Sequence, residues 1–167
     1  MTHEDILNLL DFHYWARDRM LDAVEALTPE QYRLDLGSSY RSVRETVVHI
    51  YAAEWIWHLR WLGQSPTAFP PSEQFPDVVT IRRAWTDHEL LVRACVDRIG
   101  GDVGRIMPYT LLNGTSSASP FWQLCQHVVN HASYHRGQVT TMLRQLGAPP
   151  GKSTDMILFY RERSSLG

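Results

Sequence analysis

Apolar residues recur at spacings of three and four along most of the chain, which is the pattern of amphipathic helices. The longest segments with this pattern are residues 3–26, 42–62, 79–99 and about 119–146. Residues 105–116 have an extended pattern with an Asn-Gly pair, which predicts a small hairpin between the third and fourth helices. A short segment at 155–163 predicts a C-terminal helix that could cap the bundle. The pattern therefore predicts an all-α fold, a four-helix bundle in a single domain over residues 1–167.

Polar residues and glycines mark the predicted ends of these helices. Ser42, with Glu45 three residues later, predicts a capping box at the start of the second helix. Gly63 ends that helix, and the Gly-Gly pair at Gly100 ends the third. The segment 64–77 between them contains four prolines. We expect it to be a loop, long enough to act as a lid or a partner surface.

Composition and charge narrow the class of protein. A chain of 167 residues can bury a substantial core, and a net charge of −2 does not suggest the clustered basic surface of nucleic-acid-binding proteins. No apolar run approaches the roughly 18 residues of a membrane span, and the N-terminal segment lacks the apolar region of a signal peptide. Cys95 and Cys125 lie in apolar helical patterns that require no disulfide. We expect a cytoplasmic protein that binds neither nucleic acid nor membrane.

Three histidines recur at a strict spacing of four in the fourth predicted helix: His127, His131 and His135. Residues four apart lie on the same helix face. Apolar residues share that stripe, so the imidazoles are predicted to point into the bundle; these neighbours are Leu124, Val128, Ala132, Val139, Met142 and Leu146, whereas Arg136, Arg144 and Gln145 lie mostly elsewhere. A lone buried histidine is more often a hydrogen-bonded core residue than a ligand. Three together cost desolvation and would repel one another when protonated, and a divalent metal ion removes both problems.

A second helix should contribute a ligand, because one helix face cannot close a metal site alone. The remaining histidines are His3, His13, His49, His58 and His88. His49 lies on the predicted core side of the second helix. We expect His58 to be peripheral and His88 to be solvated, whereas His13 could line the bundle axis or lie at its solvent edge. Glu45 and Glu54 flank His49 and are expected near solvent, and neither is assigned as a general base.

The sequence also resembles a known family. The segments HIYAAEWIWHLRWLG and HVVNHASYHRGQVTTMLRQLG resemble the two signature segments of the DinB-like metalloenzymes, and DFHYWARDRML and SSYRSVRETVVHI are similar to the first helix and the approach to the metal. The likeness spans nearly the whole chain in the same order. It implies a bundle, usually dimeric, in which His49, His131 and His135 hold a divalent metal ion. His127 then lies one turn away without binding the ion, and His13 departs from the asparagine common in the family.

Three histidine ligands would leave one metal position open, as in catalytic rather than structural sites. Zinc, nickel or iron(II) suits such a site, with zinc or nickel favoured. Neither the HExxH motif of metalloproteases nor the paired ExxH motif of di-iron proteins occurs in the sequence. The resemblance includes thiol-dependent S-transferases, so the first hypothesis is transfer or conjugation of a low-molecular-weight thiol whose pKa the metal lowers. The alternatives are hydrolysis of a small substrate by water activated at the metal, and a stress-linked metal- or ligand-binding protein without turnover.

The number of large aromatic side chains leads to a further expectation about assembly. Five tryptophans occur in the first three predicted helices: Trp15, Trp55, Trp57, Trp61 and Trp85. These are more large apolar side chains than a single core needs, so some of them are expected to lie at the surface. Exposed apolar patches usually mark an interface. Together with the family resemblance, this predicts a homodimer that acts on a small-molecule substrate.

Overall fold

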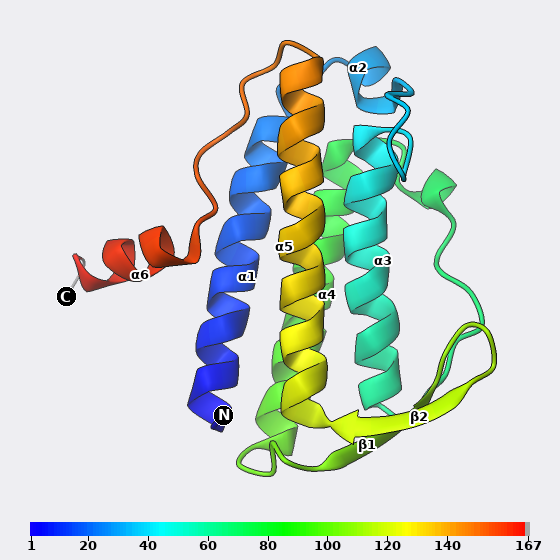
Figure 1. Ribbon diagram of the computed structural model, residues 1–167, viewed down its shortest axis with the longest axis vertical. Coiled ribbons are helices and arrows are strands. Elements are labelled where there is room, and N and C mark those ends of the chain that lie inside the picture. The colour runs from blue at the N-terminus through cyan, green and yellow to red at the C-terminus, as the bar shows by residue number, and fades with distance from the viewer. Residues whose placement is uncertain (166–167) are drawn as a thin grey trace.

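Four long helices form the body of the molecule in the computed structural model, which describes residues 1–165 (Figure 1). They are α1 (His3–Val24), α3 (Val43–Trp61), α4 (Val78–Ile99) and α5 (Phe121–Gln145). Each packs against two others, because α1 and α3 both contact α4 and α5. The predicted all-α class and four-helix bundle are therefore confirmed.

The helix ends follow the local sequence signals. The Ser42 hydroxyl accepts a hydrogen bond from the Glu45 backbone N–H at 3.2 Å and so caps α3. The predicted capping box is only half formed, because the Ser42 N–H donates to the Tyr40 carbonyl oxygen and not to the Glu45 side chain. Gly63, with a φ of 78°, takes the left-handed conformation that ends the same helix. A short helix, α2 (Pro29–Arg33), connects α1 to the segment that leads into α3.

The predicted hairpin is present and crosses the lower end of the bundle (Figure 1). Strand β1 (Ile106–Thr110) pairs antiparallel with β2 (Ser116–Pro120), and the Asn-Gly pair lies in the turn between them. The second strand extends further than the sequence pattern predicts, so α5 begins only at Phe121 with Pro120 at its N-cap. β1 packs against α3 and β2 against α5, which brings the hairpin tip beside the bundle.

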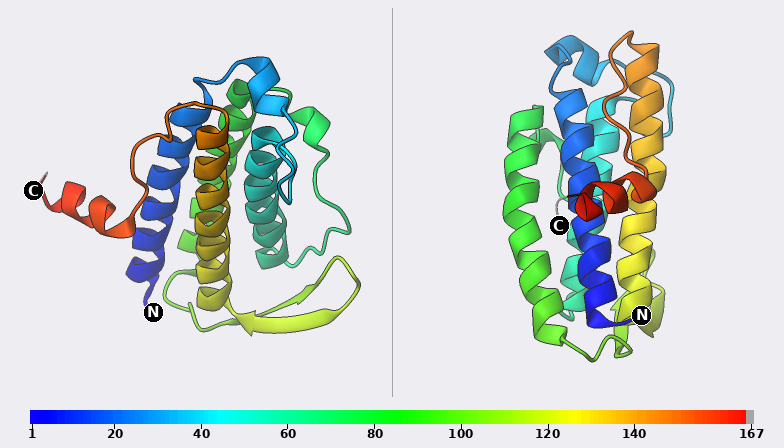
Figure 2. Two further views of the ribbon diagram at one scale, coloured as in Figure 1. Left: turned by 45° about the horizontal axis from the view of Figure 1, so that its top comes forward. Right: turned by 90° about the vertical axis from the view of Figure 1, so that its left-hand side faces the viewer.

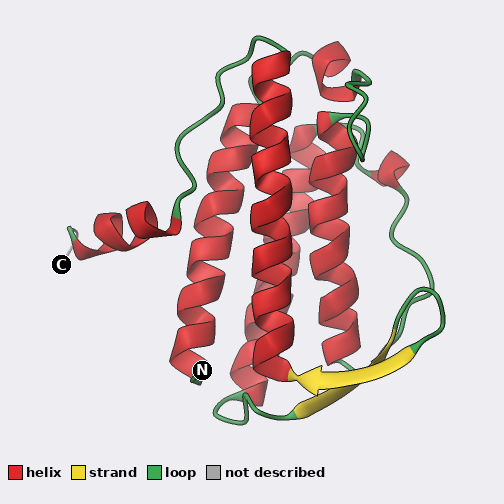
Figure 3. Cartoon of the chain, in the orientation of Figure 1, coloured by secondary structure: helices red, strands yellow, loops and turns green. Residues whose placement is uncertain are grey.

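Two smaller elements lie outside the bundle, as Figure 3 shows by secondary structure. The proline-rich loop of residues 64–77 contains the 3₁₀ helix η1 (Ser72–Gln74). Helix α6 (Met156–Ser164) crosses the side of α1 and does not cap an end of the bundle, which corrects the prediction (Figure 2). Its buried Phe159 packs against Phe12 and Trp15, with ring centroids 5.8 and 5.5 Å apart.

The tryptophans do not form the exposed patch expected from the sequence. Trp85 and Trp61 are only 1% and 4% exposed in the core, and the other three tryptophans of that set are partly buried. These tryptophans are therefore buried or partly buried within the single chain. Among the described residues, the most exposed large apolar side chains are Val79 and Leu90 on α4 and Tyr134 on α5. Within residues 1–165, no helix has both the length and the apolar character needed to cross a membrane.

Candidate metal centre

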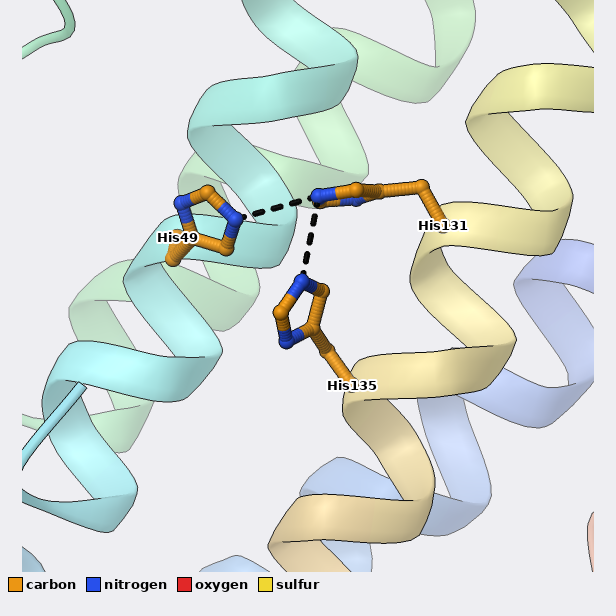
Figure 4. Close-up of side chains that lie close together, drawn as sticks. All are labelled: His49, His131 and His135. Carbon is orange, nitrogen blue, oxygen red and sulfur yellow. Dashed lines mark hydrogen bonds between the residues drawn. The ribbon is translucent and has the colours of Figure 1, made fainter. Parts of the chain in front are cut away.

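Three imidazoles converge between α3 and α5, the neighbouring helices that run in opposite directions through the bundle (Figures 1 and 4). His49 projects from α3, and His131 and His135 project from successive turns of α5. The Nε2 atom of His131 lies 3.1 Å from the Nε2 atoms of both His49 and His135. One candidate ligand atom from each of the three residues lies within 4.8 Å of the others. The structure thus brings together the three predicted ligand residues.

Hydrogen bonding orients one of these rings. The Nδ1 atom of His135 lies 2.6 Å from the side-chain oxygen of Gln138, one turn further along α5. A carbonyl oxygen can only accept, so Nδ1 must carry the proton and Nε2 keeps its lone pair for the cluster. Such a partner on the outer nitrogen fixes the tautomer and direction of a metal-binding histidine.

An aromatic ring packs against His49, the histidine that α3 contributes to the cluster. Tyr40 stacks on His49 with ring centroids 3.9 Å apart and also touches the edge of His135 at 5.4 Å. Tyr40 lies in the segment before α3, where Arg41 has a φ of 55°. That left-handed backbone is uncommon for a residue other than glycine and lies immediately after the stacked tyrosine.

The cluster favours neutral imidazoles. Burial lowers the pKa of His49 to about 4, with a further lowering from the charge of His135. Burial also lowers the pKa of His131 to about 3, and the surrounding histidines add to this effect. Both rings are therefore uncharged at neutral pH. Their nitrogen lone pairs are available to a cation.

The donor set fits a divalent ion. Tetrahedral coordination with metal–nitrogen bonds of about 2.0–2.1 Å would place ligand nitrogens about 3.3 Å apart. Two of the nitrogen pairs are at 3.1 Å, close to this spacing. Two neutral Nε2 atoms at that distance either share a proton or direct lone pairs at a common cation. The three histidines could therefore hold a metal ion, and no fourth protein ligand joins them among the described residues.

A pocket of about 360 Å³ borders the cluster. His49 and His131 line one end of it, and Trp57 and Arg60 from α3 line the rest of that wall. The opposite wall comes from Phe69 of the proline-rich loop and from the hairpin tip. No carboxylate lines this pocket among the described residues. The cluster therefore faces an open, largely apolar space.

His127 lies at this pocket and outside the cluster of candidate ligands. Its ring packs against Trp57 with centroids 5.1 Å apart and is 5.9 Å from the ring of His131. It is exposed, whereas the sequence pattern predicted that it points inward. Of the three histidines on this stripe, His135 is thus buried, His131 is partly buried, and His127 is exposed where the lower end opens into the pocket.

The first helix contributes to a different buried cluster, which corrects the prediction for Glu54 and decides between the two alternatives for His13. Glu54 is 1% exposed and not near solvent, and His13 is fully buried and not at a solvent edge. The Nε2–H of His13 donates to the Glu54 carboxylate at 2.6 Å. Tyr14 and Trp85 donate to the same carboxylate at 3.2 and 2.9 Å. His13 therefore belongs to a core hydrogen-bond network and is not among the converging ligands.

The sequence pattern also misplaced two histidines, and it placed Arg136 off the histidine stripe without predicting its burial. His58 and His88 are 3% and 6% exposed and pack ring to edge at 4.9 Å, so neither is peripheral or solvated. Arg136 is also buried, and its guanidinium donates to the Ser133 hydroxyl at 2.6 Å. None of these three contributes a ligand to the three-histidine cluster.

Sequence reasoning missed four residues around the cluster: Tyr40, Arg60, Phe69 and Gln138. Gln138 follows His135 by three residues on the same helix face, so its spacing could have identified it. Tyr40 and Phe69 lie in segments without regular periodicity, where no pattern predicts which way a ring points. Their roles depend on how the loops fold back over α3.

Comparisons with known proteins agree with this description. The model of the DinB family matches residues 1–162. Protein DinB of Bacillus subtilis (strain 168) is 26% identical over 145 residues, which cover 83% of this chain and 84% of the relative. The crystal structure of a DinB-like protein from Bacillus cereus ATCC 10987 superposes with a TM-score of 0.64 at 17% identity, over 87% of this chain and 95% of the other. On the family match over nearly the whole sequence, this chain belongs to the DinB family.

Proposed function

We propose that the protein is a divalent-metal-dependent enzyme that transfers or conjugates a low-molecular-weight thiol. The observation that carries this proposal is the convergence of three imidazoles at the end of a pocket that no carboxylate lines among the described residues. His49, His131 and His135 would hold the ion, zinc or nickel being the expected metals. The substrate would enter from the side bordered by the hairpin tip.

A bound divalent ion would supply the positive charge that lowers the pKa of a thiol beside it, so that thiolate forms at neutral pH. A thiol activated in this way needs no general base from the protein, which suits a pocket without acidic side chains. The protein's own side chains would orient the metal ligands and form an apolar wall beside the bound thiol. Gln138 keeps the Nε2 lone pair of His135 directed at the cluster, while Trp57 and Phe69 would place apolar surface beside the sulfur.

One observation favours hydrolysis of a small substrate as a second candidate function. A pocket on the other face of His49 is lined by Glu45 and Tyr40. Glu45 is partly buried there, and a carboxylate in that position is a candidate general base. Hydrolysis would therefore depend on Glu45, whereas thiol transfer would not.

The experiment that separates these functions replaces the native metal with cobalt(II). Glutathione, bacillithiol or mycothiol should each be tested for a saturable sulfur-to-cobalt charge-transfer band, because a soft sulfur ligand would bind at the open side of the site. Glu45→Gln should leave the band unchanged, and His131→Ala should abolish it. If none of the three thiols gives the charge-transfer band, but anions that mimic hydrolysis intermediates change the cobalt spectrum, hydrolysis would replace thiol transfer as the proposed function. A response to neither class would favour a binding protein without turnover.

A further inference from the structure

Arg60, in the last turn of α3, is a buried cation without a partner. Its side chain is 4% exposed, and within residues 1–165 it forms neither a salt bridge nor a side-chain hydrogen bond. Its Nε–H is fully buried and has no acceptor. Burying an unpaired guanidinium is unfavourable, so such a residue is retained where something outside the chain pairs with it.

The surroundings hold the guanidinium in place without neutralising it. Its Cζ atom lies 4.5 Å from the centre of the Trp57 ring, and Tyr109 packs against that ring at 4.9 Å. Stacking on an aromatic face orients the planar group and leaves its N–H edges free. Arg60 also lines a second pocket together with Arg98 and Arg105, and no carboxylate of residues 1–165 lines that pocket either.

Arg60 lines the same pocket as the candidate ligands His49 and His131. It follows His49 by eleven residues on α3, which is three turns on the same face, or about 16 Å along the axis. The guanidinium reaches back to Trp57, one turn nearer to the cluster. About two turns, or roughly 11 Å, then separate the unpaired cation from the three-histidine site.

We propose that Arg60 binds a carboxylate of the substrate at the end of the pocket remote from the metal, which selects thiols of about tripeptide length. This inference rests on the proposed function, because the other end of the substrate is the sulfur held at the three histidines. A carboxylate fits better than a phosphate monoester, since one guanidinium balances a single negative charge and forms paired hydrogen bonds with its planar oxygens. The hairpin-tip residue Asn113, which also lines the pocket, offers amide donors to the same group.

The test compares four probes on metal-loaded protein by titration calorimetry, with the cobalt band as a second readout for the free thiols. Glutathione has the required length and free carboxylates, and glutathione diethyl ester has the same length with both carboxylates masked. N-acetylcysteine has a carboxylate too close to its sulfur to reach both sites. S-methylglutathione keeps the carboxylates but cannot form a thiolate.

We expect glutathione to bind at least tenfold more tightly than its diethyl ester, and Arg60→Gln to remove that difference. Arg60→Lys should restore part of it, since the charge remains but the paired geometry does not. Arg98→Gln is the matched control and should change nothing, because Arg98 lines only the second pocket. N-acetylcysteine should bind wild type and Arg60→Gln equally. Because Arg60 also stacks on Trp57, the melting temperature of each Arg60 variant is measured first, and binding is compared only between variants that are folded at the assay temperature.

S-methylglutathione separates the two proposals. If no free thiol gives a cobalt band but S-methylglutathione binds wild type at least tenfold more tightly than Arg60→Gln, the thiol function fails and the role of Arg60 stands. If thiols give the band and every probe binds wild type and Arg60→Gln equally, the role of Arg60 is overturned and the thiol function stands.

Discussion

Replacing Glu54 with alanine should remove about 3–5 kcal/mol from the free energy of unfolding of the metal-free protein, because it takes away the carboxylate that accepts the hydrogen bonds of three buried donors. Burial raises the pKa of the Glu54 carboxyl, but the hydrogen bond and charge of His13 and the bond from Trp85 outweigh this and lower the pKa overall. The carboxylate is thus ionised. Burial lowers the pKa of His13 against the raising effect of Glu54, so that ring is neutral at pH 7.

The magnitude follows from the groups that would be left unpaired. His13, Tyr14 and Trp85 each donate to Glu54, and an unsatisfied buried donor costs about 1–3 kcal/mol. Summed, three stranded donors give at least about 3 kcal/mol, in line with the cost of removing one partner from a buried pair. Total stabilities are usually about 5–15 kcal/mol, so the loss is a large share. Glu54→Gln keeps the volume and one acceptor, so it should cost about 1–3 kcal/mol.

The assay is urea unfolding at pH 7 with a chelator present, followed by tryptophan fluorescence. Glu45→Ala is the matched control, because Glu45 also flanks His49 on α3 but is only partly buried, and it should lose no more than about 1 kcal/mol. The linear extrapolation gives the difference in free energy for each variant. If Glu54→Ala lost no more than Glu45→Ala, the reasoning about stranded donors would be wrong.

Further predictions concern the metal site and assembly. Metal analysis of protein purified without chelators should find close to one divalent ion per chain; alanine at His49, His131 or His135 should abolish binding, whereas His127→Ala should retain it, and full occupancy in a ligand variant would remove that residue from the site. Gln138→Ala should weaken metal affinity about 10–100-fold in a competition titration, because the His135 ring loses its orienting partner; unchanged affinity would count against that role. The metal-free protein should lose stability as pH falls from about 6.5 toward 4, because His49 and His131 bind protons in the unfolded chain over this range but not in the folded cluster, where their pKa values are about 4 and 3. A urea midpoint that stays constant across this pH range would contradict the prediction. Light scattering at micromolar concentration should give the mass of a homodimer, and a monomeric mass would refute it.

The sequence pattern predicted the bundle well because each long helix has a face with regular apolar spacing. The pattern was a poor guide to which polar side chains on α3 are buried. Glu45 lies four residues before His49 and Glu54 five residues after it, and the pattern placed both near solvent. Most of α3 is buried on several faces, including Ala52, Ala53 and the Glu54 side chain itself. When apolar residues surround a helix, periodicity cannot tell which face a buried carboxylate occupies.

The three candidate ligands were predictable in identity only through the resemblance, because the spacing of four on α5 includes His127 as well as His131 and His135. Their convergence depends on the register of α3 against α5 across 82 residues of sequence, which no local pattern contains. The same limit applies to Tyr40 and Arg60. Both act through contacts set by tertiary packing, one from an irregular loop and one through burial at the base of the bundle.

The pocket is built from two kinds of structure that differ in how well they tolerate substitution: packed helices and the tip of the hairpin. The three histidines sit on packed helices, whereas the wall facing them includes Leu111, Leu112 and Asn113, of which the two leucines lie at an exposed turn. Exposed loop tips tolerate substitution and insertion far better than packed helices do. Residues 111–113 are therefore a natural place for relatives to diversify in substrate choice while the bundle stays constant, whereas Gly114, with a φ of 84°, is required by the turn. A library confined to this tip would explore new specificities with little risk to folding.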